Sequence, residues 1–151
     1  MKSFLDAIKK KYPVQILQRE VVSCEEASLA KGIPLTNELK SLVLTTNKGY
    51  YVVHIPGDMM VDLRKIKNYL TVNEAFLASK DDLKKLGVQP GTVSPFVEAI
   101  WNLPHLISSD LLLLDFVSTN IGELNKFMNF PPSELLENPC IRIGNFCRKE
   151  G

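Results

Sequence analysis

The chain has 151 residues, of which 45% are hydrophobic and 23% charged, ordinary values for one globular domain with a substantial core. Its 18 basic and 17 acidic residues leave a net charge of +1, which excludes a global polybasic surface for nucleic acid. The cysteines are odd in number, which argues against a disulfide framework: Cys24, Cys140 and Cys147.

The N-terminal segment does not have the composition of a signal peptide. Asp6 and the run Lys9-Lys10-Lys11 stand where a signal peptide would continue its apolar core. The apolar run Leu111 to Leu114 is far too short to cross a bilayer. Together with the odd cysteine count, these features predict a soluble protein of the reducing cytoplasm with no membrane partner. We expect a monomer.

Apolar spacing and capping residues predict short elements in the first half of the chain. Ser23 and Glu26 form a Ser-x-x-Glu capping box, and Gly32 suits the left-handed position that ends a helix. In order, we expect a helix over 3–11, a strand over 14–22, a helix ending at Gly32, strands over 42–44 and 50–53 joined by a hairpin at 46–49, and a helix from Asp62 to Leu70.

The second half continues the same interleaved pattern. The segment 100–107 stays open between helix and strand, because Pro104 disfavours both a long helix and a central strand. Strands interleaved with short helices and hairpins predict an α+β fold with a mixed, largely antiparallel sheet. The remaining expected elements are strands over 75–78, 111–118, 126–130 and 141–143, a helix that Ser79 and Asp82 begin, and a helix over 131–137.

The segment 87–96 concentrates two glycines and two prolines after a short amphipathic run. Gly87 is expected to take the left-handed conformation that closes a helix. Pro90-Gly91 suits the central positions of a type II turn, and Pro95 favours an extended Ser94. A stiff backbone with small side chains can approach a ligand closely. The alternative is an ordinary helix-to-strand connection.

Lys40 begins an apolar strand, in the sequence Leu39-Lys40-Ser41-Leu42-Val43-Leu44. Strand alternation places Lys40 on the same face as Leu42 and Leu44. A lysine on an inward face is costly unless a counter-charge or an anionic ligand meets it, which makes Lys40 a candidate site residue. The alternative is a lysine at the strand entrance with its ammonium group in water.

Other chemistries find little support in the sequence. His54 and His105 are far apart, and Cys140 and Cys147 are separated by six residues, so neither pair has the spacing of a local metal site. There is no phosphate-binding loop, dinucleotide fingerprint or nucleophile elbow, although a serine triad stays open because triads are defined by geometry. Cys24 lies where a helix N-terminus lowers a thiol pKa, or is a semi-buried small residue. We expect no metal and no cofactor.

The order and spacing of these segments resemble the YbaK/EbsC family, free-standing relatives of the editing domain inserted in bacterial prolyl-tRNA synthetases. The resemblance covers about Ser23 to Phe146. It rests on Glu25-Glu26-Ala27, Lys31-Gly32-Ile33-Pro34, Leu39 to Leu44, Ile55-Pro56-Gly57-Asp58, Asp62-Leu63-Arg64-Lys65, Gly87 to Phe96, Asn120-Ile121-Gly122 and Ser133-Glu134-Leu135-Leu136.

The resemblance implies a single domain over 1–151, with a curved, mixed, largely antiparallel sheet flanked by short helices. It implies a metal-independent deacylase that acts in trans on mischarged tRNA, above all tRNA(Pro) carrying a small wrong amino acid such as Ala or Cys. The family's key lysine falls on Lys40, the catalytic candidate. The expected substrate-binding residues are Ser41, Gly91, Thr92, Val93, Ser94, Pro95, Asn120 and Gly122.

The chemistry that the resemblance implies needs no nucleophilic side chain. An aminoacyl ester is labile, so backbone groups near Gly91 to Ser94 and Gly122 would position a water and stabilise the oxyanion. Lys40 would hold the terminal adenosine phosphate or the ester carbonyl. The expected partner is the acceptor end of an aminoacyl-tRNA, and a synthetase is a candidate source of further tRNA affinity.

Three residues depart from the residues that are common in the family at their positions. Thr92 stands where many relatives have glycine, Val97 replaces a frequent glycine, and Glu123 lies in a segment that is often basic. They motivate an alternative function, a non-catalytic module of the same fold that senses aminoacyl-tRNA or a small aminoacyl ligand. A third alternative is an interaction protein that has kept the fold alone.

Overall fold

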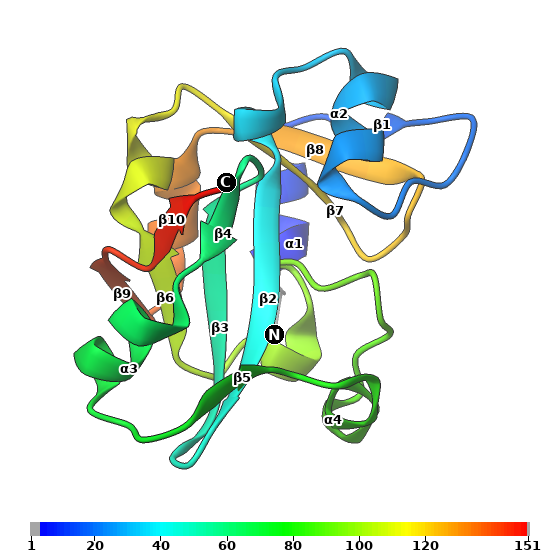
Figure 1. Ribbon diagram of the computed structural model, residues 1–151. Coiled ribbons are helices and arrows are strands. Elements are labelled where there is room, and N and C mark those ends of the chain that lie inside the picture. Colours follow the sequence, from blue (N-terminus) through cyan, green and yellow to red (C-terminus); the bar gives the residue numbers. More distant parts are fainter. Residues whose placement is uncertain (1–3, 151) are drawn as a thin grey trace.

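The structure, a computed structural model of residues 4–150, is built around a five-stranded mixed sheet (Figure 1). In spatial order its strands are β5 (Ala75–Leu77), β2 (Leu39–Thr46), β3 (Gly49–Pro56), β6 (His105–Ser108) and β9 (Ile141–Gly144). Strand β2 pairs antiparallel with β3 and β5, whereas β3, β6 and β9 run parallel to one another.

The β2–β3 hairpin is the centre of the sheet, and its turn is the one expected at Thr46 to Gly49. The Thr46 hydroxyl donates to the Gly49 carbonyl at 2.7 Å and accepts from the Lys48 N–H at 3.0 Å. Gly49 has φ +112°, which a residue with a side chain rarely adopts. The resulting register places Ser41 opposite His54, a pairing that matters for the site below.

Two smaller antiparallel sheets flank the large one. The first has the order β1 (Gln15–Ile16), β8 (Lys126–Phe130) and β7 (Val117–Asn120), and an isolated parallel bridge between Glu38 and Ser118 connects it to the chain just before β2. The second joins β10 (Cys147–Lys149) to β4 (Met59–Val61). The 3₁₀ turns are η1 (Leu35–Asn37), η2 (Glu98–Ile100), η3 (Ser109–Leu113) and η4 (Pro132–Glu137).

Short helices cover both faces of the large sheet. Helix α3 (Leu63–Leu70) packs Ile66 and Leu70 in one core cluster with Leu44 and Val53. Helix α1 (Phe4–Lys9) packs against Ile107 on the other side, where α4 (Lys80–Leu86) also contributes to the core. No helix in residues 4–150 is long and apolar enough to span a membrane.

The expected helix ends are confirmed. Asp62 accepts from the Lys65 N–H at 3.1 Å and so begins α3. Ser79 and Asp82 form a reciprocal capping box for α4, and Gly87 closes that helix with φ +81°. Helix α2 (Cys24–Lys31) begins at Ser23, which accepts from the Glu26 N–H at 3.0 Å, and ends at a left-handed Gly32.

Several expected elements are wrong. The strand predicted over 14–22 survives only as β1, since the following segment is a loop in which the Leu17 and Val21 N–H groups donate to carbonyls of the β7–β8 connection. The strand predicted over 111–118 is the 3₁₀ turn η3 followed by β7, and Leu113 is 86% exposed, so this leucine run does not form a buried strand.

Other differences concern element type or extent. The segment 100–107 contains the end of η2 and the start of β6, and the helix expected over 131–137 is the 3₁₀ turn η4. Strands β4 and β10 had no counterpart among the expected elements. The start of the helix expected over 3–11, and both ends of the domain expected over 1–151, lie outside the described residues. The α+β class with mostly antiparallel pairing is confirmed.

Candidate functional site

A pocket of about 470 Å³ lies along the free edge of β2, a size typical of ligand sites. Strand β5 pairs only with the end of β2, from Leu44 to Thr46, so the earlier part of this edge has no neighbouring strand in the described chain. The expected site residues that line the pocket come from three separate segments and are Lys40, Ser41, Gly91, Val93 and Asn120.

Lys40 reaches its partner on the inward face, as the strand alternation predicts. Its Nζ donates to the Met59 carbonyl at 2.7 Å, where the chain turns from β3 into β4. Its neighbours on that face, Leu42 and Leu44, pack in the core beneath α3. Among residues 4–150, a backbone carbonyl rather than a counter-charge therefore meets the half-buried ammonium, and two of its three N–H donors remain for a ligand.

The segment 87–96 forms the turn expected from its sequence. The Thr92 N–H donates to the Gln89 carbonyl at 3.1 Å, which closes a turn with Pro90 and Gly91 at its centre and Gly91 at φ +88°. Gly91 faces the pocket, and a Cβ at this position would lie within 4 Å of Val22 and Leu124. The turn thus presents bare backbone to the cavity.

Four expected substrate-binding residues lie near the pocket but do not line it: Thr92, Ser94, Pro95 and Gly122. The Thr92 side chain folds back onto its own turn, where Oγ1 donates to the Gln89 carbonyl at 2.7 Å. Ser94 is fully buried and accepts from the Phe96 N–H at 3.3 Å. Direct contact of these four residues with a ligand stays a prediction.

Asn120 is the expected site residue from the β7 end. Its Oδ1 accepts from the Gly122 N–H at 2.9 Å, which leaves the NH₂ group of this pocket-lining residue as a donor for a ligand. The same bond uses the Gly122 N–H, so that group is not free to bind an oxyanion. Glu123, one of the departures from the family, forms a 3.0 Å ion pair with Lys126.

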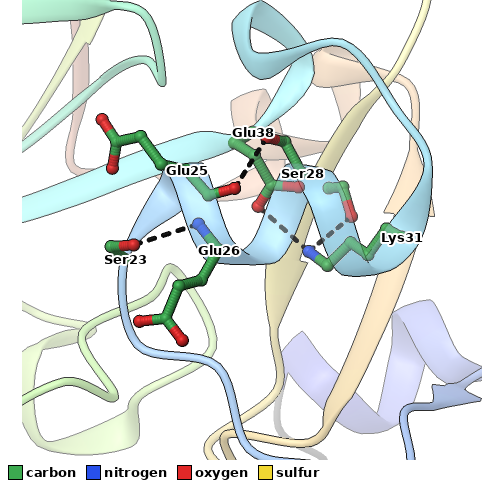
Figure 2. Close-up of polar contacts among 7 residues, drawn as sticks. Ser23, Glu25, Glu26, Ser28, Lys31 and Glu38 are labelled. Atoms are coloured by element: carbon green, nitrogen blue, oxygen red, sulfur yellow. Dashed lines mark hydrogen bonds and ion pairs between the residues drawn. The ribbon is translucent and has the colours of Figure 1, made fainter.

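A buried ion pair that sequence analysis missed also lines the pocket. Figure 2 shows the contact between its two side chains. Lys31 at the end of α2 reaches Glu38 at 3.0 Å, and the two side chains are 3% and 5% exposed. The Lys31 ammonium also donates to Ser118 Oγ at 3.0 Å and lies 4.5 Å from the Phe127 ring centre. Glu38 directly precedes an apolar strand. Extending the strand alternation back by one residue pair from Lys40 would have placed Glu38 on the same inward face.

Burial controls the titration of this pair. Desolvation lowers the pKa of Lys31 and raises the pKa of Glu38, and each partner's charge partly opposes the shift of the other. Glu38 Oε2 has no hydrogen-bond partner. The pair therefore depends on both residues, since either charge alone would be buried without compensation.

Cys24 also lines the pocket, at the first position of α2. Burial raises the pKa of its thiol to about 11, although the positive charge of Lys40 acts in the opposite direction. The thiol is therefore protonated near neutral pH, so the semi-buried alternative holds and a thiolate nucleophile does not.

Two histidines that are far apart in sequence meet in the core. His54 on β3 and His105 on β6 join through ring nitrogens 2.9 Å apart, and Ser41 lies 2.8 Å from the other ring nitrogen of His54. Sequence spacing gave no indication of this contact. In the described part of the chain, no group of three or more His, Cys, Asp or Glu residues has a geometry that would hold a metal ion.

The family model described as an aminoacyl-tRNA editing domain matches residues 18–138. This range includes every pocket-lining residue except Leu17, the Lys31–Glu38 pair, and the chain from Ser41 through His54 to His105. The chain belongs to this family. The match confirms the resemblance noted above and assigns the pocket region to an aminoacyl-tRNA editing domain.

Curated relatives of this editing domain are proline–tRNA ligases. The enzyme of Sulfurihydrogenibium sp. is 28% identical over 108 residues, which are 71% of this chain and 18% of the ligase. The enzyme of Fervidobacterium nodosum is 34% identical over 65 residues, or 42% of this chain and 11% of the ligase. The chain thus spans less than a fifth of the length of these ligases.

Solved structures share the fold along nearly the whole length of both chains. The hypothetical protein APE2540 superposes with a TM-score of 0.83 at 23% identity, covering 97% of this chain and all of that one. A proposed trans-editing enzyme for prolyl tRNA synthetase superposes with a TM-score of 0.81 at 24% identity, covering 100% and 99%. These structures confirm the fold of the editing domain.

Proposed function

We propose that this editing domain is an aminoacyl-tRNA deacylase that acts in trans and hydrolyses the ester of mischarged tRNA. The preferred substrate is tRNA(Pro) carrying a small wrong amino acid such as Ala or Cys. The observation that carries the proposal is the convergence of Lys40, Gly91 and Asn120 on one pocket. The relation to proline–tRNA ligases, and the likeness to a proposed trans-editing enzyme for prolyl tRNA synthetase, support the choice of tRNA.

Lys40 supplies the positive charge of the proposed site. One N–H of its ammonium donates to the Met59 carbonyl, which holds the group in place and leaves two donors for a ligand. A fixed donor stabilises negative charge without reorganisation, whether on a terminal phosphate or on the carbonyl oxygen of the ester. We therefore assign Lys40 the main electrostatic role.

The proposed reaction needs no nucleophilic side chain of the protein. A water oxygen adds to the ester carbonyl carbon, the carbon–oxygen bond to the ribose breaks, and the ribose oxygen takes up a proton. The bare backbone at Gly91 allows the ester to lie close to the wall, and the Asn120 NH₂ group is a further donor. No step of this scheme uses a metal, and we expect a chelator to leave the rate unchanged.

Pocket size sets the proposed preference for small acyl groups. Apolar side chains from several elements surround the edge of β2 and leave a limited volume: Leu17, Val21, Leu39, Val43, Leu83 and Val93. A single methylene changes binding in a fitted pocket by about 1–3 kcal/mol, which permits discrimination between neighbouring amino acids. With a net charge of +1, the domain is expected to bind tRNA weakly unless a synthetase supplies affinity.

The test is hydrolysis of a panel of tRNA(Pro) charged with Ala, Cys, Ser and Pro, with and without a chelator. We expect release of Ala or Cys well above the buffer rate, slower release of Pro, and no effect of the chelator. Saturable binding of a non-hydrolysable aminoacyl-adenosine without any turnover would instead support the binding module. Absence of both binding and turnover would support the third alternative, an interaction protein that has kept the fold alone.

A further inference from the structure

A continuous hydrogen-bonded chain leads from the pocket into the core. Ser41 Oγ lies 2.8 Å from His54 Nδ1, His54 Nε2 lies 2.9 Å from His105 Nδ1, and His105 Nε2 lies 2.9 Å from the Ile100 carbonyl oxygen. Both imidazoles are about 1% exposed. Ser41 alone among the three side chains lines the pocket.

The far end of the chain fixes the direction of every proton in it. The carbonyl of Ile100 can only accept, so His105 Nε2 carries a hydrogen. In a neutral imidazole the second nitrogen is then an acceptor, so His54 Nε2 donates to His105 Nδ1 and His54 Nδ1 accepts. The only remaining donor for His54 Nδ1 is the hydroxyl of Ser41.

Burial keeps both rings neutral, which this assignment requires. Desolvation, reinforced by the neighbouring His105, holds the pKa of His54 well below its ordinary value. Desolvation also lowers the pKa of His105, against the opposing effect of its backbone hydrogen bonds. A histidine this resistant to protonation is a poor general base, so the chain orients the serine rather than activating it as a nucleophile.

A hydroxyl whose only proton points inward can offer nothing but lone pairs to the pocket. Ser41 shares its face of β2 with Leu39 and Val43, both of which line the pocket near Val93. Lys40 points to the opposite face, towards Met59. This arrangement separates an apolar end that suits an acyl group from the cationic end that suits a phosphate or carbonyl.

We propose that His54 and His105 are positioning residues that present the Ser41 oxygen as an acceptor for the free α-ammonium group of an aminoacyl ester. The inference rests on the proposed function, because it names the group recognised at the acyl end of the same pocket. It makes the site selective for free aminoacyl groups over deaminated ones. It also means that Ser41 does not stabilise the oxyanion, because that role requires a hydrogen-bond donor.

The proton direction is measured directly by nitrogen-15 NMR of the imidazoles. We expect both His54 and His105 to carry hydrogen on Nε2 and none on Nδ1. A hydrogen on Nδ1 of His54 would reverse the chain, make Ser41 a donor to the pocket and overturn the proposal. This measurement needs neither a ligand nor turnover, so its outcome is independent of the deacylase assignment.

The ammonium assignment is tested by binding of 3′-alanylamino-3′-deoxyadenosine and its propionyl analogue, which lacks only the amino group. A hydrogen bond to a charged group predicts a preference of about ten- to a hundredfold for the alanyl analogue in the wild type. Ser41→Ala is expected to remove most of this preference. If the wild type binds neither analogue, the aminoacyl assignment of the pocket fails together with the proposed function, whereas the NMR result stands.

His105 gives the more selective variant because it does not line the pocket. In His105→Phe the His54 Nε2–H loses its acceptor, so His54 is expected to move its hydrogen to Nδ1 and turn the Ser41 proton towards the ligand. The alanyl preference should then fall, whereas His105→Gln, whose amide oxygen can still accept, should retain it. An unchanged preference in Ser41→Ala, or equal losses for both analogues, would refute the assignment even if His105→Phe does not fold.

Discussion

Two buried polar networks meet β2 beside the same pocket, and they are built on different principles. The Lys31–Glu38 network is charged, reaches Ser118 on β7, and is incompletely bonded, since Glu38 Oε2 has no partner. The chain from Ser41 through His54 to His105 is neutral, and each member of it is bonded to the next. The charged pair is stable because each charge compensates the other. The neutral chain instead fixes which atom of each hydrogen bond carries the hydrogen.

The largest expected effect is a loss of stability when the charged network is broken on one side. Lys31→Met leaves the Glu38 carboxylate buried without a counter-charge, which should lower the unfolding free energy by about 3–5 kcal/mol. The double variant Lys31→Met/Glu38→Leu removes both charges and should recover most of this loss. Denaturant unfolding of the single and double variants measures the difference, and a double variant as unstable as the single one would contradict it.

The neutral network is expected to make the unfolding free energy depend on pH. The folded state keeps His54 and His105 unprotonated, while the unfolded chain binds protons as the pH falls through about 6.5. The histidine contribution to the unfolding free energy should therefore be level above pH 7 and decrease below 6.5, by up to about 1.4 kcal/mol per pH unit for each histidine. The raised pKa of Glu38 acts in the opposite sense, because the folded state holds that proton more tightly.

His105→Gln is the matched variant for this profile, because it removes one titrating group and keeps an acceptor for His54. Its slope between pH 5.5 and 6.5 should be shallower than that of the wild type. Unfolding titrations of both proteins at several pH values measure the difference, from which the common contribution of Glu38 cancels, and equal slopes for wild type and His105→Gln would show that His105 is not held neutral.

The smallest change in stability is expected for an exposed ion pair that, like the buried one, consists of a lysine and a glutamate. Lys11 and Glu134 lie 3.3 Å apart, but the lysine side chain is 60% exposed. Because solvent screens this pair, Lys11→Met should change the unfolding free energy by less than about 1 kcal/mol. A loss as large as that in Lys31→Met would mean that burial is not what distinguishes the two pairs.

Local chemistry explains which features could be predicted from the sequence. The cap at Ser79, the helix end at Gly87 and the turn at Pro90-Gly91 depend on residues within a few positions of one another, and all three form as expected. The family resemblance added Lys40 and Asn120, which share a pocket although 80 positions separate them in the sequence.

Features that depend on distant pairing were missed. The contact between His54 and His105 requires the parallel register of β3 and β6, which no local pattern encodes. The pairing of β4 with β10 joins residues more than 80 positions apart. The run Leu111 to Leu114 was misread because hydrophobicity alone does not distinguish a buried strand from a 3₁₀ turn with one exposed face.

The central claim is that the pocket beside Lys40 hydrolyses an aminoacyl ester, and single-turnover release of alanine from Ala-tRNA(Pro) tests it most directly. Lys48, exposed in the β2–β3 turn, provides the matched control. Wild type and Lys48→Met should release alanine at the same rate, while Lys40→Met should be slower by roughly 10²- to 10³-fold, as for loss of one fixed donor to a developing charge. Equal rates for Lys40→Met and wild type would contradict the account.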